Sequence, residues 1–180
     1  MIKGWGKQGF TVVEILIVVV VIGILATIVL VAYNGVRESG YDRGTQADIN
    51  ALADQIDLKT LDDQSTPPGG AVSSSTSGAS TFPGVTFKSN KSVYATNVTN
   101  LYYCTGTIGG IQRYAIVGQS KTGKVYAYQS ESGLKEYDYT LTTAFTGGPA
   151  LCVSLGFSAP YTWSFGLNGT NGAWASWVTN

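Results

Sequence analysis

The chain has 180 residues, of which 11 are Lys or Arg, 11 are Asp or Glu and none is His, so its formal net charge is zero. This balance argues against nucleic acid as a main partner, because phosphate binding relies on clustered Lys and Arg. The lack of His removes the commonest general base and the commonest neutral metal ligand, so we expect neither an enzyme nor a cofactor or metal site. A charged fraction of 12%, with abundant Gly, Ser, Thr and Tyr, suits an extracellular β-rich domain.

A long apolar run follows a short basic segment at the N-terminus. Lys3 and Lys7 precede Gly9, and from residue 10 to residue 32 the only ionisable side chain is Glu14. About 20 apolar residues suffice for a helix to cross a bilayer core, and an acid beside hydrocarbon marks a function and needs a partner. A secretory signal peptide places its small-residue cleavage site after the apolar stretch. Here the small residue comes first, so cleavage would leave the apolar helix on the mature protein.

Residues 7–16 read Lys-Gln-Gly-Phe-Thr-Val-Val-Glu-Ile-Leu, which resembles the leader and N-terminus of type IV pilins and pseudopilins. The resemblance implies cleavage after Gly9 by a membrane prepilin peptidase and N-methylation of Phe10. It also implies a role in subunit assembly for Glu14, whose carboxylate would pair with the N-terminal amine of a neighbouring subunit. Pairing within one chain, and a carboxylate that simply reaches the lipid headgroups, are the alternatives.

The chain is expected to have an α+β, type IV pilin-like fold, in which a long N-terminal helix packs on a small antiparallel sheet. Gly35, Gly40 and Gly44 predict a weakened joint, because each glycine costs about 1 kcal/mol relative to Ala inside a helix. Helical periodicity resumes near Ile49, so this half of the helix should pack on the sheet. We expect a leader (1–9), a transmembrane and filament-core helix (10–32), its amphipathic continuation (33–62), a Ser/Thr/Pro/Gly-rich connecting loop (63–100) and a β-rich head (101–180).

Alternating patterns predict several strands in the head. Residues 101–108, 112–119 and 124–129 are expected strands, with a hairpin turn at 120–123. Weaker strand candidates are residues 151–155 and 161–167, and residues 174–178 are expected to be an edge strand or a tail folded onto the sheet.

The two cysteines, Cys104 and Cys152, are expected to form one disulfide in an exported domain. A loop of this size would stabilise the fold by roughly 4 kcal/mol. A redox or metal role is disfavoured, because the spacing lacks the C-x-x-C pattern.

Other residues have two interpretations each. Four acids could suggest a cation site, but their spacing does not match an EF-hand loop, so a solvated surface is favoured; they are Asp54, Asp57, Asp62 and Asp63. Eight aromatic residues are expected mainly in core or sheet packing, and some in an adhesive patch or subunit interface; they are Tyr102, Tyr103, Tyr126, Tyr128, Trp163, Phe165, Trp174 and Trp177.

We therefore expect a structural subunit of a type IV pilus, serving in adhesion, motility or DNA uptake. The implied partners are copies of itself, other pilins, a prepilin peptidase, an inner-membrane platform protein and an assembly ATPase. Lipid would hold the single-pass precursor in the inner membrane, with the head outside the cytoplasm, before the subunit enters an extracellular pilus. The alternatives are a pseudopilin of a type II secretion or competence system, and a monomeric membrane-anchored surface binding protein.

Overall fold

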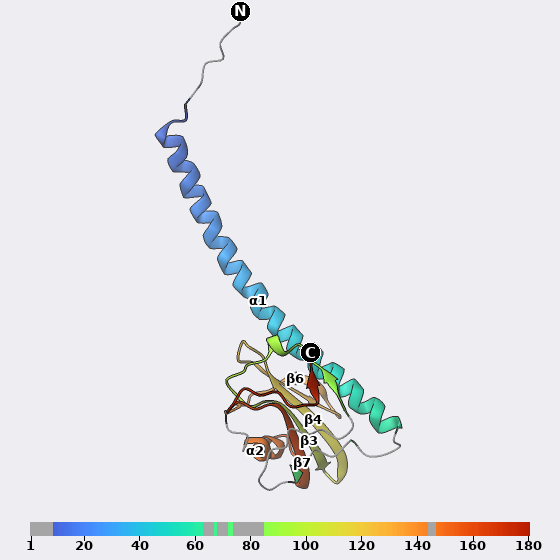
Figure 1. Cartoon of the computed structure of the whole chain (residues 1–180). Helices are drawn as coiled ribbons and strands as arrows, with labels where there is room; N and C mark the ends of the chain where they lie inside the picture. The colour runs from blue at the N-terminus through green and yellow to red at the C-terminus, as the bar shows by residue number, and fades with distance from the viewer. Residues whose placement is uncertain (1–8, 63–66, 68–71, 74–84, 144–146) are drawn as a thin grey trace, which may run out of the picture. The chain divides into compact units, whose positions relative to one another are not determined.

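The computed structural model describes residues 9–62, 67, 72–73, 85–143 and 147–180 (Figure 1). It divides the chain into two compact units, Met1–Arg37 and Glu38–Asn180. Residues 1–8 of the expected leader (1–9), and residues 63–66, 68–71 and 74–84 of the expected connecting loop (63–100), lie outside the described residues.

The helix α1 covers Val12–Asp62 without a break. Val and Ile dominate its first half, yet a helix is the one conformation in which a lone apolar segment satisfies its own backbone in lipid. The glycines of the expected joint all lie inside the helix, so they do not interrupt it. Gly44 has a packing reason of its own, because a Cβ there would lie 2.7 Å from Cγ1 of Val93.

In the second unit one stripe of α1 is buried. Thr45, Ile49, Leu52, Ala53 and Ile56 recur at helical spacing, and all five are inaccessible to solvent. This spacing places them on one face. The expected packing of this half of the helix on the sheet is confirmed.

The second unit contains a six-stranded antiparallel sheet in the order β1-β7-β3-β4-β5-β6. Its strands are β1 (Val72–Ser73), β3 (Asn100–Ile108), β4 (Ile111–Gln119), β5 (Val125–Gln129), β6 (Gly133–Glu136) and β7 (Ser158–Leu167). The expected hairpin turn between β4 and β5 is confirmed. The strand β6 was not foreseen, because its four residues show little alternation between apolar and polar side chains.

Three short elements complete the segment before β3 and the end of the chain. The strand β2 (Phe87–Lys88) pairs in parallel with β8 (Val178–Thr179), and the 3₁₀ helix η1 covers Lys91–Val93. Of the two alternatives for residues 174–178, the structure supports a tail folded onto the main sheet. Trp174 forms an isolated bridge with Leu167 of β7, and Ala175 and Trp177 are buried in the core on that sheet, ahead of β8.

Both faces of the main sheet are buried. On one face, Tyr103, Tyr114 and Ile116 pack with the buried stripe of α1. On the other face, Tyr102, Cys104 and Trp163 pack with the helix α2, which covers Gly147–Ser154. Alternate residues of a strand point to opposite faces, so neighbours such as Tyr102 and Tyr103 enter different cores.

The helix α2 corrects one expectation, because residues 151–155 were predicted to be a strand. Periodicity cannot distinguish a short buried strand from a buried helix. Leu151 and Cys152 of the helix, and Leu155 directly after it, are buried against the sheet. Gly148 allows this approach, because a Cβ at that position would overlap the indole ring of Trp163.

Candidate functional site

The N-terminus of α1 carries the residues expected to be processed. Gly9 and Phe10 precede the helix, and Phe10 is 83% exposed. The peptide bond between them therefore lies outside regular secondary structure, in the segment where a peptidase could bind it in an extended form.

Glu14 takes part in a reciprocal helix cap with Thr11. The Thr11 backbone N–H and hydroxyl each donate a hydrogen bond of 2.8 Å to Oε2 of Glu14, and the Glu14 N–H donates a longer one of 3.3 Å to Oγ1 of Thr11. This is a capping box, which satisfies backbone N–H groups that the first turn leaves without partners. The carboxylate is thus held at the N-terminal end of the helix.

Sequence reasoning missed Thr11, although the signal was present. A Thr followed three residues later by a Glu, ahead of an apolar run, is the sequence pattern of a capping box. Glu14 was predicted only to act in assembly, so its helix-capping contact with Thr11 was not predicted.

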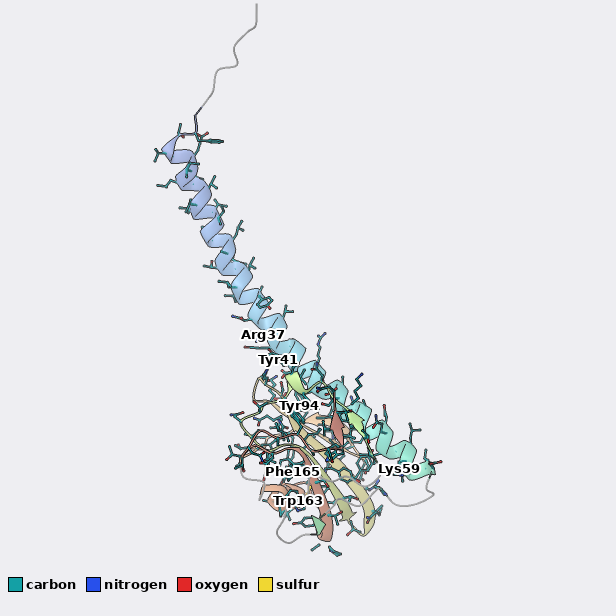
Figure 2. All side chains as sticks on the ribbon, in the orientation of Figure 1. Arg37, Tyr41, Lys59, Tyr94, Trp163 and Phe165 are labelled. Atoms are coloured by element: carbon teal, nitrogen blue, oxygen red, sulfur yellow. A yellow bond between two sulfur atoms is a disulfide. The ribbon has the colours of Figure 1, made fainter. Side chains whose placement is uncertain are left out.

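The apolar part of α1 is exposed around its whole circumference. Among the described residues, it is the one helix long and apolar enough to cross a membrane, with a mean hydropathy of 3.4 over its best 18 residues and none of that window buried. Figure 2 shows side chains projecting on every side of this part of the helix. Such a surface needs lipid or other apolar helices around it, which fits a single-pass membrane-anchored precursor.

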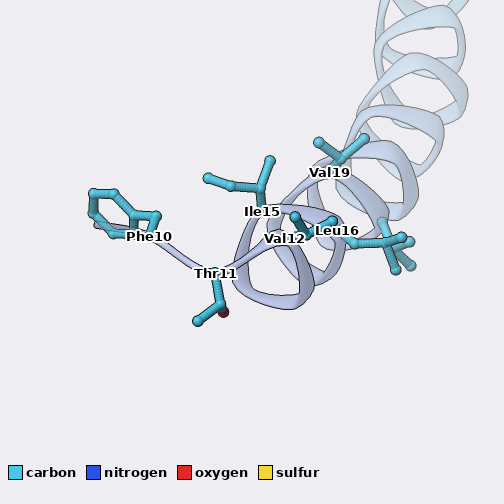
Figure 3. Close-up of a pocket in the computed structure, with 7 residues that line it drawn as sticks. Phe10, Thr11, Val12, Ile15, Leu16 and Val19 are labelled. Atoms are coloured by element: carbon cyan, nitrogen blue, oxygen red, sulfur yellow. The ribbon is translucent and has the colours of Figure 1, made fainter. Parts of the chain in front are cut away.

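An open apolar hollow of about 500 Å³ lies beside the capped end (Figure 3). Phe10 forms one of its sides, and Val12, Ile15 and Val19 line it farther along the helix. The capped carboxylate of Glu14 and the apolar hollow therefore lie at the same end of the helix.

In the second unit, Asp48 connects α1 with the segment after β2. Its Oδ2 accepts hydrogen bonds from the Ser89 hydroxyl at 2.8 Å and from the Asn90 N–H at 2.9 Å. Burial raises the pKa of Asp48, and these two hydrogen bonds partly offset that effect. Asn90 accepts a hydrogen bond from the Ser92 N–H through its side chain and so caps η1.

The turn between β4 and β5 is bound to α1 by three contacts. The Thr122 hydroxyl donates a hydrogen bond of 2.5 Å to Asp42, and Nζ of Lys124 lies 3.9 Å from the same carboxylate. Nζ of Lys121 lies 5.3 Å from the ring centre of Tyr41. Charged and aromatic residues of this stretch of α1 therefore serve to hold the helix on the sheet.

Asp57, one of the four acids weighed as cation ligands, has a different role. It accepts a hydrogen bond of 2.7 Å from the hydroxyl of Tyr114, which also lies 3.2 Å from the carbonyl of Ala53. Burial and the neighbouring carboxylate raise the pKa of Tyr114. Within the described ranges, no three residues among His, Cys, Asp and Glu are grouped as metal ligands. Asp63 lies outside those ranges.

Cys104 of β3 and Cys152 of α2 are joined by a disulfide, with their Cα atoms 5.7 Å apart. Most of the aromatic residues considered for an adhesive patch are buried instead, among them Trp163 and Phe165 of β7, labelled in Figure 2. Tyr128 and Trp174 are half-buried against the core between α1 and the sheet. The structure therefore assigns these side chains to packing.

The comparisons with known proteins concern mainly the N-terminal part. Residues 6–30 match the family described as "Prokaryotic N-terminal methylation motif". The chain is 33% identical over 88 residues to the type II secretion system core protein G of Escherichia coli K12, which covers 49% of this chain and 61% of that protein. It is 36% identical over 61 residues to the protein of the same name from Dickeya chrysanthemi, covering 34% of this chain and 40% of the relative.

These curated relatives are matched over about half of their length, from 40% to 61%. No solved structure matches the chain significantly. The matches confirm the resemblance of the N-terminal segment to prepilin-like proteins that carry a methylation motif, and they connect the chain with secretion-system relatives.

Proposed function

We propose that this chain, a pilin-like protein with the prokaryotic N-terminal methylation motif, is a structural subunit of a type II secretion pseudopilus. The observation that carries the proposal is the match of residues 6–30 to the methylation motif, joined to an apolar helix that is exposed on all sides. The curated relatives are secretion core proteins rather than pilus subunits, which favours a pseudopilin over the type IV pilin first expected.

Processing would create the assembling end of the subunit. Cleavage after Gly9 frees an amine on Phe10, and Gly suits the residue before the cut because it lets an extended backbone enter a narrow site without a side-chain clash. Methylation of the Phe10 amine would follow. The expected mature protein begins at Phe10, and an intact mass that still includes residues 1–9 would contradict this step.

Glu14 would set the register of a subunit as it enters the fibre. Its carboxylate is held at the N-terminal end of α1 by Thr11, close to the position of the new amine. An ammonium and a carboxylate attract far more strongly in an apolar setting than in water. A subunit whose amine reaches the Glu14 of its neighbour would therefore be favoured over one displaced along the helix.

Cross-linking can test polymerisation directly. Single Cys substitutions at exposed positions of 15–32, such as Ile17 and Leu25, are made in the full chain and oxidised in cells that express the secretion machinery. A polymer should give ladders of cross-linked species, because it places these positions against copies of themselves. A Cys at exposed Ile111, in the head, serves as the matched control. Uniform absence of ladders along the helix would instead indicate a monomeric membrane-anchored protein.

A second experiment separates the two fibre types. Deletion of the gene for this chain should abolish secretion of a folded reporter substrate. Cells that make the chain should show no long surface filaments in electron microscopy. Abundant sheared filaments made mainly of this chain, with normal secretion in the deletion strain, would favour a type IV pilus. Prepilin peptidase, the assembly ATPase and the platform protein are proposed partners in either case.

A further inference from the structure

Two neighbouring segments of the second unit carry lysines and no acid. Residues 85–99 and residues 119–124 contain no Asp or Glu. The Lys121 N–H donates a hydrogen bond of 2.8 Å to the carbonyl of Val93, so the two segments lie side by side. We call this surface the basic end of the second unit, and its lysines are Lys88, Lys91, Lys121 and Lys124.

The basic end is attached to the first turns of α1 in the second unit, which begins at Glu38. Nζ of Lys121 lies 5.3 Å from the ring centre of Tyr41, labelled in Figure 2. Val93 packs so close to Gly44 that a Cβ on this glycine would lie 2.7 Å from Cγ1 of the valine. The lysines are therefore held beside this stretch of the helix.

In the described part of the chain, ion pairs engage one of the four lysines. Two carboxylates lie 3.7 and 3.9 Å from Nζ of Lys124, whereas Lys88, Lys91 and Lys121 have no such partner there. Nζ of Lys91 lies 5.5 Å from the ring centre of Trp174. A ring contact on one side leaves N–H donors of the ammonium for other acceptors.

The adjoining helix leaves a local surplus of positive charge. From residue 38 to residue 48, α1 has three acids and one base, which are Glu38, Asp42, Asp48 and Arg43. Together with the four lysines this makes five basic and three acidic side chains, in a chain whose formal net charge is zero. The carboxylate of Asp48 is occupied by two hydrogen bonds from the segment after β2.

The helix also limits how far the basic end can lie from a membrane that holds α1. Val36 ends the exposed apolar part of the helix, and Tyr41 follows five residues later. Five residues of helix span about 7.5 Å. The headgroup layer is about 5–8 Å thick on each side of a bilayer, and charges act over about 8 Å at physiological ionic strength. Lys121, which lies over Tyr41, is therefore within reach of the headgroups.

A membrane surface with negatively charged headgroups fits this arrangement. Lysines close to an anionic leaflet are attracted to it. Because α1 already holds the unit at the bilayer, the lysines act at a high effective concentration, and a few of them suffice to favour one orientation.

We propose that the basic end binds anionic phospholipid headgroups while α1 spans a bilayer, and that this contact turns the basic end of the second unit toward the membrane. The proposal rests on the anchoring of α1 in lipid. It does not depend on cleavage or polymerisation.

The test compares two labelling sites in the full chain, reconstituted in vesicles. The native cysteines are joined in a disulfide, so one added Cys can be labelled alone. Ser92→Cys places a fluorophore at an exposed position of the basic end, and Ile111→Cys places it at the opposite end of β4, about 27 Å along the strand. A lipid with a spin-labelled headgroup quenches the fluorophore that lies near the membrane surface.

In vesicles with about 30% phosphatidylglycerol in phosphatidylcholine, we expect quenching at position 92 to exceed quenching at position 111 about twofold or more. In phosphatidylcholine alone the difference should be lost. Salt at about 1 M should reduce it, because the screening length falls to about 3 Å.

Charge variants identify the residues responsible. Lys91→Gln with Lys121→Gln should lose the difference in quenching, whereas Lys91→Arg with Lys121→Arg should keep it. Lys59→Gln with Lys135→Gln, in the last turn of α1 and in β6, removes the same charge elsewhere in the unit and is the matched control. The control pair should quench as the wild type does.

Three results would overturn the proposal. Equal quenching at the two positions in anionic vesicles would show that the basic end is not turned toward the membrane. A difference that persists in phosphatidylcholine alone would show that headgroup charge does not set the orientation. Equal losses in the two glutamine pairs would show an effect of net charge without a defined surface.

Two further measurements keep the test decisive. Flotation of the chain with the vesicles verifies that α1 is anchored, so a failure of insertion is distinguished from a failure of the proposal. Thermal unfolding verifies that each variant is folded. If the glutamine pair at Lys91 and Lys121 fails to fold, the dependence of the wild type on lipid and salt still decides the outcome.

Discussion

Two stretches of the same helix differ in where their partners come from. Leu25 and its neighbours in the first unit are exposed on all sides, whereas Leu52 and the rest of the buried stripe are covered by the sheet. Both stretches are apolar and helical. The first therefore needs lipid or another chain to bury it, and the second is buried by its own chain. The difference separates the part of the molecule that is proposed to assemble from the part that folds on itself.

A pair of matched leucine substitutions tests this contrast with the largest expected effect. Leu52→Ala should destabilise the head by about 2–5 kcal/mol, because it leaves a cavity in a fully buried core. Leu25→Ala, at a side chain that is 56% exposed, should leave unfolding of the head unchanged. Chemical denaturation of both variants in detergent, followed by tryptophan fluorescence, measures the two effects. Similar losses in the two variants would contradict the division.

A substitution at Tyr114 tests how one buried hydrogen bond holds α1 on the sheet. Tyr114→Phe should cost about 1.5–3 kcal/mol at neutral pH, because the hydroxyl donates to the carboxylate of Asp57. The folded pKa of Tyr114 is raised above its usual 10, by burial first and then by Asp57. The stabilisation is therefore complete below pH 10 and is lost as pH rises from there toward the folded pKa. Denaturation of both proteins between pH 7 and 11 tests this, and a difference that grows above pH 10 would contradict it.

A substitution of Glu14 tests the stretch of α1 that is proposed to assemble. Glu14→Ala should still be inserted and cleaved, but should reduce the yield of cross-linked multimers about tenfold or more, equivalent to roughly 1.4 kcal/mol in the assembly equilibrium. Glu38→Ala removes an exposed acid from the same helix and should assemble normally. Intact mass reports cleavage, and the cross-linking ladder reports assembly. Normal ladders from the Glu14 variant would refute its role.

Asp48 gives the smallest effect. Its folded pKa is raised above 3.8 by burial, so the folded state binds the proton more tightly than the unfolded state does. The contribution of this carboxyl is therefore most favourable below pH 3.8 and declines as pH rises through its raised pKa. The stability of the wild type relative to Asp48→Asn should therefore fall over that interval. An increase with pH would mean that the bonds from Ser89 and Asn90 outweigh burial.

Much of the fold follows from local patterns. The apolar run of α1, the helical spacing of Ile49, Leu52 and Ile56, and the alternation around the turn at 120–123 each depend on residues close in sequence. The strand β6 and the helix α2 were missed for the opposite reason. Their conformations are decided by partners distant in the chain, such as β5 for β6 and the ring of Trp163 for α2.

The candidate sites divide in the same way. Gly9, Phe10 and Glu14 lie close together in the sequence, so their pattern could be recognised without a structure. The role of Asp57 could not, because its partner Tyr114 lies 57 residues away. The contact between Asp48 and Ser89 likewise joins residues that are 41 positions apart.

The sequence alone determined that this chain has an apolar helix with an acid near its start and an N-terminal methylation motif, because those features are local and periodic. Tertiary structure decided which part of that helix is buried, and which acids are bound by residues distant in the sequence, as Asp57 is by Tyr114. Burial and hydrogen bonding depend on which distant segments meet, and local periodicity carries no information about that.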